Sequence, residues 1–259
     1  MIIRADGIGT RFNKIFINKD VSFAGEAGEI IGILGETGSG KTTLLKAICQ
    51  IIPYDGTVEI EGTNLKKLSN RELSRLISYI PQKNGISLDI SALDVVLMGF
   101  NNRLTVLEKP NSAMVSEALR ALESVGMKDF AEHNFCQLSE GQKQLVIFAR
   151  ALVSEAKLMV LDEPESALDV NKRSALMKFI RDWVGAEKCA VTVLHDPGLA
   201  LNYCDKLILI KNAGVSGIIR PKNDTIEDME RALEAIYGGV TLARVADKAG
   251  REQLVMLKE

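Results

Sequence analysis

The feature that most constrains the fold of this chain is a glycine-rich segment, Gly35 to Thr42, which reads GETGSGKT. It fits the pattern G-x-x-x-x-G-K-[ST] without a mismatch. It follows an apolar run, Glu29 to Leu34, and precedes an apolar stretch with helical character, TTLLKAICQII. Glycines in such a turn let successive backbone N–H groups point at an anion, and the positive end of the next helix adds to them. We therefore expect a strand, a phosphate-binding loop and a helix in that order.

The side chains of this loop predict the chemistry of the bound group. Lys41 is expected to reach the β- and γ-phosphates of a nucleotide, and the Thr42 hydroxyl is expected to ligate Mg²⁺. A glycine-rich turn that binds nothing is the alternative, and the joint presence of strand, loop, Lys-Thr pair and helix disfavours it. The residues expected to contact the nucleotide phosphates are Gly35, Glu36, Thr37, Gly38, Ser39, Gly40, Lys41, Thr42 and Thr43.

A second apolar strand ends in two acids, in the segment Leu158 to Pro164, LMVLDEP. Asp162 is expected to support the Mg²⁺ ion, and Glu163 is expected to act as a general base or to orient a water molecule. An acidic pair after a strand is often only the start of a helix, but here it accompanies a phosphate-binding loop. The two motifs together favour a nucleotide-hydrolysing site.

The remaining pattern predicts an α/β fold with a mainly parallel sheet. Further buried strands are expected at Lys157–Leu161, Cys189–Leu194 and Lys206–Ile210, and Gly56–Gly62 alternates like an edge strand of an antiparallel piece. From about residue 88 to 156 helical spacing replaces the strands, with a core-facing stripe at Leu145, Phe148, Ala149 and Leu152. Near the end, Thr225 and Asp228 predict the cap of a helix running to Tyr237, and Val240–Val245 and Gln253–Leu257 could pair as strands across ADKAGRE.

Composition excludes several classes of protein. The chain has 32 basic and 34 acidic side chains, a net charge of -2, which argues against a protein that grips nucleic acid. The four cysteines (Cys49, Cys136, Cys189, Cys204) are scattered, so they are expected to be buried free thiols rather than a disulfide framework or a zinc site. No apolar run approaches the roughly 18 residues that span a bilayer. The chain is expected to be soluble by itself, and any membrane role must come through a partner.

The segment Leu138 to Gln142, LSEGQ, lies just ahead of an amphipathic helix, and at this point the chain resembles the ABC ATPase family, whose signature reads LSGGQ. The resemblance covers about residues 1 to 215 and implies a RecA-like P-loop NTPase with an inserted helical lobe. Other motifs of the family match in order. Phe12, with Phe16 as the poorer candidate, resembles the aromatic that stacks on adenine. Gln82 resembles the glutamine that touches Mg²⁺ and water. Ser166 to Asp169 resembles the D-loop, and His195 resembles the histidine that contacts the γ-phosphate.

The resemblance implies an active Mg²⁺-dependent ATPase that works as a homodimer. In the family, ATP is held between the P-loop of one subunit and the signature residues of the other, here Ser139, Gly141 and Gln142, with Asp169 beside them. The sequence departs from the family pattern in three places. Glu140 replaces a glycine of the signature, Thr37 stands where Asn is common, and Glu165 stands where a small hydroxyl residue is usual. None of these changes removes a catalytic group.

The expected role is the ATP-hydrolysing subunit of a transporter, peripheral at the cytoplasmic face of the cell membrane, bound to integral-membrane permease subunits and indirectly to an extracytoplasmic substrate-binding protein. Asp94 to Gly99, DVVLMG, with HDPGLALNYCDKLILIKNAGV and AIYGGV, resembles importer ATPases for iron–siderophore, haem and cobalamin. Import of another substrate such as molybdate is an alternative, and a soluble ABC ATPase acting on DNA or ribosomes is a further one. The expected division is residues 1–87 and 157–215 for the two parts of the ATP-binding core, 88–156 for the helical lobe with the signature, and 216–259 for a C-terminal extension.

Overall fold

The computed structural model describes residues 1–83, 85–105, 108–246, 250 and 252–258. Its main sheet has the strand order β10-β9-β3-β8-β7-β6 and is parallel except for β10, which pairs antiparallel with β9. This outcome confirms the α/β class with a mainly parallel sheet. The strands are β3 (Ile30–Gly35), β6 (Ile77–Ile80), β7 (Leu158–Asp162), β8 (Cys189–Val193), β9 (Lys206–Lys211) and β10 (Gly214–Ile219).

A second sheet is antiparallel, with the order β2-β1-β4-β5. It contains β1 (Ile3–Phe12), β2 (Ile15–Gly25), β4 (Asp55–Ile60) and β5 (Thr63–Asn64). The expectation that Gly56–Gly62 forms an edge strand is wrong, because β4 pairs with β1 on one side and with the short β5 on the other. The alternation of this segment reflects one buried and one exposed face, which an interior strand of an antiparallel sheet shows equally well.

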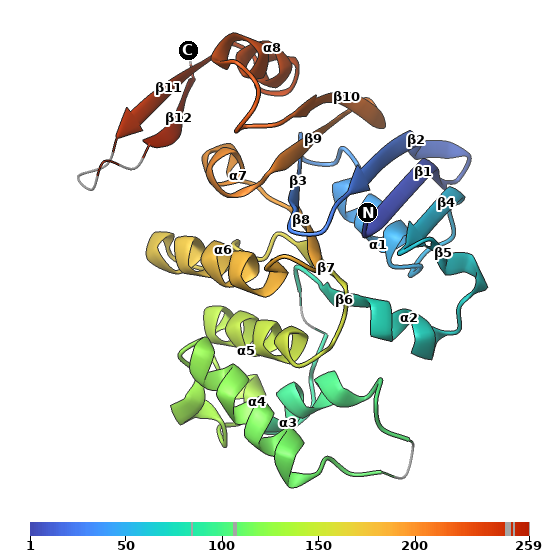
Figure 1. The fold of residues 1–259 in the computed structure, drawn as a ribbon, viewed down its shortest axis with the longest axis vertical. Coiled ribbons are helices and arrows are strands. Elements are labelled where there is room, and N and C mark those ends of the chain that lie inside the picture. Colours follow the sequence, from blue (N-terminus) through green and yellow to red (C-terminus); the bar gives the residue numbers. More distant parts are fainter. Residues whose placement is uncertain (84, 106–107, 247–249, 251, 259) are drawn as a thin grey trace.

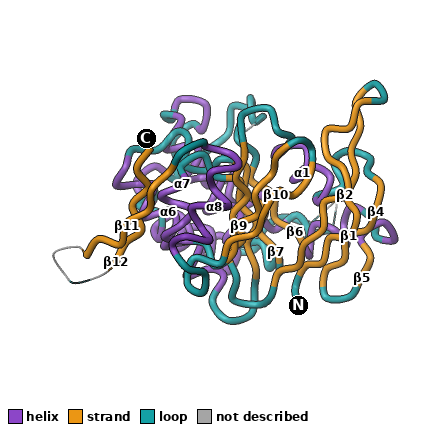
Figure 2. Tube along the Cα trace, turned by 90° about the horizontal axis from the view of Figure 1, so that it is seen from above, coloured by secondary structure: helices purple, strands orange, loops and turns teal. Residues whose placement is uncertain are grey.

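The two faces of the main sheet pack against different layers, as Figure 2 shows from above. On one face, alternate residues of the strands such as Ile31 and Ile33 pack with α1 (Lys41–Ile48) and with the antiparallel sheet. On the other face, residues such as Ile30 and Leu34 pack with helices from the C-terminal half of the chain. Those helices are α6 (Val170–Val184), α7 (Pro197–Tyr203) and α8 (Ile226–Tyr237). Because a parallel strand between two layers is buried on both faces, its sequence is a continuous apolar run.

Helices occupy the stretch between β6 and β7, in the lower part of Figure 1. They are α3 (Ala92–Leu97), α4 (Ser112–Ser124) and α5 (Glu140–Leu152), and α2 (Asn70–Leu76) comes before β6. The core-facing stripe predicted on α5 is confirmed: Phe148 and Ala149 are buried, and Leu145 and Leu152 are half-buried and pack against the same core. Val146 and Ile147 are buried as well. The stripe is wider than predicted because α5 packs against α3 and α4 and also against β6.

The C-terminal elements match the predicted order. Thr225 caps α8 and accepts a hydrogen bond from the backbone N–H of Asp228, and α8 ends at Tyr237. Strands β11 (Val240–Ala246) and β12 (Glu252–Lys258) pair as an antiparallel hairpin, and part of the ADKAGRE stretch between them lies outside the described residues. The hairpin is fastened at its two edges by side chains. Glu230 accepts from the backbone N–H of Leu242, and the Asn202 amide bonds both the N–H and the C=O of Leu254.

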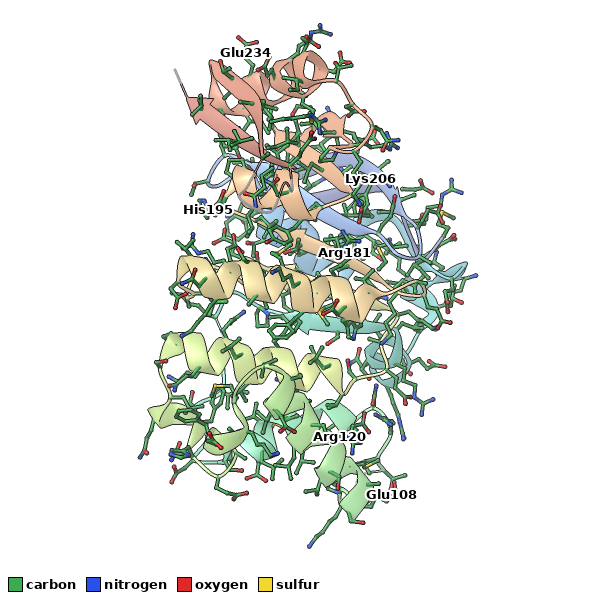
Figure 3. All side chains as sticks on the ribbon, turned by 60° about the vertical axis from the view of Figure 1, so that its left-hand side comes forward. Glu108, Arg120, Arg181, His195, Lys206 and Glu234 are labelled. Atoms are coloured by element: carbon green, nitrogen blue, oxygen red, sulfur yellow. The ribbon has the colours of Figure 1, made fainter. Side chains whose placement is uncertain are left out.

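A polar cluster joins the start of β3 to the C-terminal half of the chain. The Asp205 carboxylate accepts hydrogen bonds from the Ile30 N–H at 2.9 Å, from Arg181 at 2.7 Å and from Lys222 at 2.7 Å. Arg181 also donates to two backbone carbonyls, which makes it a brace between α6 and the strand ends. Figure 3 labels Arg181 and Lys206 in this part of the molecule.

Two further expectations concern single side chains and helix length. Cys49, Cys189 and Cys204 are buried as predicted, but Cys136 is exposed, because it lies in the short 3-10 helix Phe135–Gln137, which buries Phe135 and turns Cys136 outward. No helix of the described residues is long and apolar enough to cross a membrane.

Candidate functional site

The phosphate-binding loop lies where the sequence predicts it, between the end of β3 at Gly35 and the start of α1 at Lys41. Gly40 has a φ of 94°, and a Cβ there would lie 2.7 Å from the backbone oxygen of Ile17. A Cβ on Gly35 would lie 2.5 Å from the backbone oxygen of Ile210. Glycine is therefore required at both ends of the loop by close backbone approach and, at Gly40, by the left-handed conformation.

Lys41 points into the loop. Its Nζ donates to the backbone oxygens of Gly35 and Glu36, each at 2.8 Å, and only 7% of the residue is exposed. Burial lowers the pKa of Lys41, and the carboxylates of Glu163 and Asp162 act in the opposite direction. Within the described residues, the direct partners of this buried ammonium group are carbonyl oxygens, so it is well placed to exchange one of them for a phosphate oxygen.

Ser39 adds an unused polar atom to the same cradle. Its backbone N–H donates to Glu36, and its hydroxyl is buried without a hydrogen-bond partner among the described residues. Buried hydroxyl groups are normally satisfied, so this one fits a loop built to receive a ligand oxygen.

Thr42 and Asp162 meet at the edge of the sheet. The Thr42 hydroxyl donates to the Asp162 carboxylate at 2.9 Å, and Asp162 is 2% exposed. The two residues are 120 positions apart in sequence, but β3 and β7 both end at this edge, on either side of β8. Burial raises the pKa of Asp162, and the Thr42 hydrogen bond opposes that rise. A hydroxyl and a carboxylate in contact supply the hard oxygen ligands that Mg²⁺ prefers.

Glu163 lies between two other predicted residues. Its Oε2 accepts a hydrogen bond from the Gln82 amide at 2.6 Å, and its Oε1 is 3.9 Å from Nε2 of His195. Gln82 follows β6 and His195 follows β8, the two neighbours of β7 in the sheet. Glu163 has a φ of 48°, a left-handed conformation that is uncommon outside glycine and is often found at active sites. Figure 3 shows His195 above α6, at the left-hand rim of the molecule.

The two aromatic candidates lie on opposite sides of the turn between β1 and β2. Phe16 lines a hollow of about 260 Å³ together with the loop residues Glu36 to Ser39 and with Lys211 to Ala213, and Phe12 is not among the lining residues. Phe12 is 69% exposed, whereas Phe16 is 38% exposed and carries the Arg11 guanidinium 4.2 Å from its ring centroid. The hollow therefore favours the candidate that the sequence ranked second.

The signature residues form a separate constellation. Ser139 is the exposed N-cap of α5, and it shares a capping box with Gln142, whose side chain accepts from the Ser139 N–H at 2.9 Å. Gly141 lies against the turn after Glu163, because a Cβ there would be 3.1 Å from the backbone oxygen of Ala167. Asp169 caps α6 by accepting from the Lys172 N–H at 3.0 Å. The hydrogen bonds of these capping residues stay within their own helix ends, and α5 lies in the lower half of Figure 1, apart from α1.

The fold, together with the cluster of Lys41, Thr42, Asp162 and Glu163 at the phosphate-binding loop, defines a P-loop nucleoside triphosphatase. Residues 18–166, more than half of the chain, match the family model described as ABC transporter. The chain is 33% identical to the manganese transport system ATP-binding protein of Bacillus subtilis over 92% of each chain. It is 32% identical to a hemin import ATP-binding protein of Rhizobium etli over 82% of each chain. The chain therefore belongs to the ABC transporter family and is one of its ATPases.

Solved structures share the fold over nearly the whole chain. A chain from an inward-facing transporter described as of metal-chelate type is similar with a TM-score of 0.82 and 25% identity, over 100% of this chain and 98% of that one. A dimeric ATP-binding cassette in a post-hydrolysis state, bound to ADP and Pi, is similar with a TM-score of 0.76 and 26% identity, over 86% of this chain and 100% of that one. These likenesses confirm the predicted fold of a P-loop NTPase with a helical lobe.

Proposed function

We propose that two copies of this chain close around two ATP molecules and that hydrolysis powers a separate permease that imports a metal-containing substrate. The observation that carries the proposal is the division of the site. Lys41, Thr42, Asp162 and Glu163 gather at one edge of the sheet, whereas Ser139 is exposed on another part of the chain. This separation supports two half-sites in each copy, one for the phosphates and one with the signature, and a two-fold symmetric pair of copies would complete both.

The phosphate half-site would act through five side chains. Thr42 and Asp162, with the amide oxygen of Gln82, would hold Mg²⁺, which when bound supplies positive charge to the β- and γ-phosphates. Lys41 would bind the same phosphates after release of one carbonyl partner. Glu163 would accept a proton from the attacking water or orient it, since Gln82 and His195 flank its carboxylate.

The signature half-site would supply hydrogen-bond donors from the second copy. Ser139 and Gly141 stand at the start of a 13-residue helix, where backbone N–H groups and the helix dipole favour an anion. Glu140 would not block this surface, because its carboxylate turns to Lys143 of its own helix at 2.8 Å. This pairing supports an active signature despite the missing glycine.

The nucleobase would stack on Phe16 rather than on Phe12. Phe16 stands on the wall of the hollow beside the phosphate loop, and one face of its ring is covered by Arg11. The other face is then the one available to a base, in an arrangement that adds a cation–π contact to stacking.

The permease would dock on the groove between α2 and α3. This groove has a volume of about 560 Å³, and its described lining includes Arg71, Asp94, Leu97 and Met98. The helix α3, which forms one wall of the groove, follows Gln82 in sequence. A movement of the permease against this groove would therefore be transmitted along the chain from α3 back to Gln82 and its partner Glu163. Through the permease the chain would act at the cytoplasmic face of the membrane, as a peripheral subunit, and indirectly with an extracytoplasmic substrate-binding protein.

The substrate would be a metal chelate such as an iron chelate, haem or cobalamin. Relatives named for hemin import and for iron chelatin transport support this class, and the relative named for manganese transport supports a bare metal ion as the variant. Molybdate import, and a soluble role on DNA or ribosomes, are the alternatives from sequence. The net charge of -2 gives no support to nucleic-acid binding.

The test of the motor is Glu163→Gln with Glu187→Gln as a matched control. Glu187 is an exposed carboxylate that precedes β8, at the opposite end of the parallel strands from Glu163. We expect Glu163→Gln to lose ATP turnover and to accumulate as an ATP-bound dimer, measured by phosphate release and by light scattering after gel filtration. The control should keep both properties of the native chain. Unchanged hydrolysis in Glu163→Gln would remove the assignment of the base, and a monomer under all nucleotide conditions would remove the shared site.

The test of the transport role is purification from native membranes after mild solubilisation. A polytopic permease that co-purifies, and that is lost when Met98 and Leu97 are both changed to Asp, would support the proposed groove. Co-purification of ribosomes or DNA in place of a permease would contradict the transporter assignment.

A further inference from the structure

Glu165 is a buried acid whose position is unusual for this site. It lies in the turn between β7 and α6, two residues after Glu163, where the ABC family usually has a small hydroxyl residue. The residue is 1% exposed. Because an isolated carboxylate is costly to bury, its hydrogen bonds should reveal why it is there.

One carboxylate oxygen of Glu165 bonds the loop that carries His195. The backbone N–H of His195 donates to Oε1 of Glu165 at 2.8 Å. The other oxygen, Oε2, is buried and has no hydrogen-bond partner among the described residues. Burial raises the pKa of Glu165, and the hydrogen bond from the His195 N–H opposes that rise. Burial of the Glu165 carboxylate is therefore costly, and the hydrogen bond that offsets part of this cost comes from the backbone N–H of His195.

The same turn connects three parts of the site. The Ser166 N–H donates to the Glu163 carbonyl at 3.2 Å, and the Leu168 N–H donates to the Glu165 carbonyl at 3.0 Å, so the turn is tightly hydrogen-bonded. Gly141 of the signature lies against it at Ala167. A displacement of this turn would therefore move the Glu165 carboxylate and, through it, the backbone of His195.

We infer that Glu165 is a positioning residue that sets the place of the His195 imidazole relative to the Glu163 carboxylate. The imidazole Nε2 lies 3.9 Å from Glu163, and the imidazole itself is largely exposed, so few other contacts hold it. The inference rests on the proposed function, in which His195 flanks the Glu163 carboxylate, and on the expected contact of His195 with the γ-phosphate. It adds that a movement of α5, the helix that carries the signature residues, reaches His195 through the Glu165 side chain. A hydroxyl residue at position 165 is too short to make the same hydrogen bond to the His195 N–H.

The kinetic test compares Glu165→Ala and Glu165→Gln, each with and without His195→Ala. Glutamine keeps a side-chain oxygen that accepts from the His195 N–H, whereas alanine does not. We expect Glu165→Ala to lower kcat about tenfold with KM changed less than about twofold, and Glu165→Gln to keep kcat within about threefold. In the His195→Ala background, Glu165→Ala should lower kcat by less than about twofold, because the group that it positions is already gone.

A matched control comes from Glu230, another carboxylate that accepts from a backbone N–H, that of Leu242 in the C-terminal hairpin. Glu230→Ala removes the same kind of contact away from the sheet edge and should leave kcat unchanged. An equal loss of kcat for Glu165→Ala in both backgrounds would overturn the inference, because it would indicate a general effect on folding or packing. An equal loss for alanine and glutamine would overturn it as well, since the acceptor oxygen would then not matter.

A second measurement applies even where a variant is too unstable for kinetics. In the native chain, hydrogen exchange of the His195 amide should be protected, and Glu165→Gln should keep that protection while Glu165→Ala loses it. An unprotected His195 amide in the native chain would refute the hydrogen bond directly. If His195→Ala keeps full turnover, the role of His195 in the proposed function fails, whereas the contact between the two turns is still judged by the exchange rate.

Discussion

The choice between Phe16 and Phe12 as the base-stacking residue yields the sharpest prediction for nucleotide binding. The two side chains lie next to the same turn, Phe12 at the end of β1 and Phe16 near the start of β2, so their alanine variants remove the same ring from neighbouring positions. Phe16 lines the hollow beside the phosphate loop, and Phe12 is absent from its lining. We expect Phe16→Ala to weaken ATP binding and Phe12→Ala to leave it nearly unchanged.

The magnitude follows from the contacts of the Phe16 ring. Stacking of a base on an aromatic side chain contributes about 1–3 kcal/mol by alanine substitution. A base stacks on one face of the ring, so the Arg11 guanidinium, 4.2 Å from the ring centroid, leaves this contribution intact. The range of about 1–3 kcal/mol corresponds to a Kd raised about 5- to 150-fold. For Phe12→Ala the expected change is less than about twofold.

The assay is displacement of a fluorescent ATP analogue by ATP and, separately, by tripolyphosphate. Loss of stacking should weaken ATP but not tripolyphosphate, because the latter has no base. A Phe16→Ala variant that binds both competitors more weakly would indicate damage to the loop rather than loss of stacking. Weaker ATP binding in Phe12→Ala with native binding in Phe16→Ala would refute the reasoning from the hollow.

Three further predictions concern the loop, the metal ligands and the polar cluster at Asp205. Gly40→Ala should lower the free energy of unfolding by about 2 kcal/mol or more, because the new Cβ meets a backbone oxygen at 2.7 Å. Gly38→Ala has nothing within 4 Å of its new Cβ and should lower the free energy of unfolding by only about 1 kcal/mol, for its positive φ. Urea unfolding compares the two variants, and equal losses of stability would contradict the steric argument. Thr42→Val should abolish the gain in ATP affinity that Mg²⁺ provides, whereas Thr42→Ser should keep it. Titration of each variant with ATP, with and without Mg²⁺, measures this gain. A valine variant with a native response to Mg²⁺ would exclude Thr42 as a ligand. Asp205→Asn should lower stability at pH 7 by about 2 kcal/mol, since the half-buried Arg181 loses its charged partner. Burial alone would raise the pKa of Asp205, but its hydrogen bonds lower it overall. The carboxylate therefore contributes stability above about pH 4, and this contribution decreases as the pH falls through the lowered pKa. A stability gap between native and variant chains that does not shrink as the pH falls below about 4 would be inconsistent with that sign.

The sequence predicts those parts of the site that depend on strand ends. Asp162 and Thr42 are far apart in the chain, yet both follow apolar runs, and parallel strands bring their carboxyl ends to one edge. The same logic places Glu163 and His195 at this edge, because each follows a predicted strand. Gln82 is identified in the sequence only by its resemblance to the family motif, since no strand is predicted before it.

The parts that the sequence does not predict depend on register and on long-range contacts. Next to the turn the register of β1 and β2 is regular: Phe12 pairs with Ile15 and Arg11 pairs with Phe16. Phe12 and Phe16 therefore lie on opposite faces of the hairpin, but the sequence does not show which face turns toward the phosphate-binding loop. The bond from His195 to Glu165 joins residues 30 positions apart, and Glu165 stands out in the sequence only as a departure from the family pattern.

The fastening of the C-terminal hairpin has a consequence for association between copies. A two-stranded sheet ordinarily offers two open edges to any extended segment, which is a route to strand addition and aggregation. Here Glu230 occupies the β11 edge at Leu242, and Asn202 occupies the β12 edge at Leu254. An incoming strand could extend across the middle of either edge only by breaking these bonds. Any contact made there by another molecule should therefore use the outward side chains of the hairpin, such as Val245, Val255 and Leu257, and not its backbone.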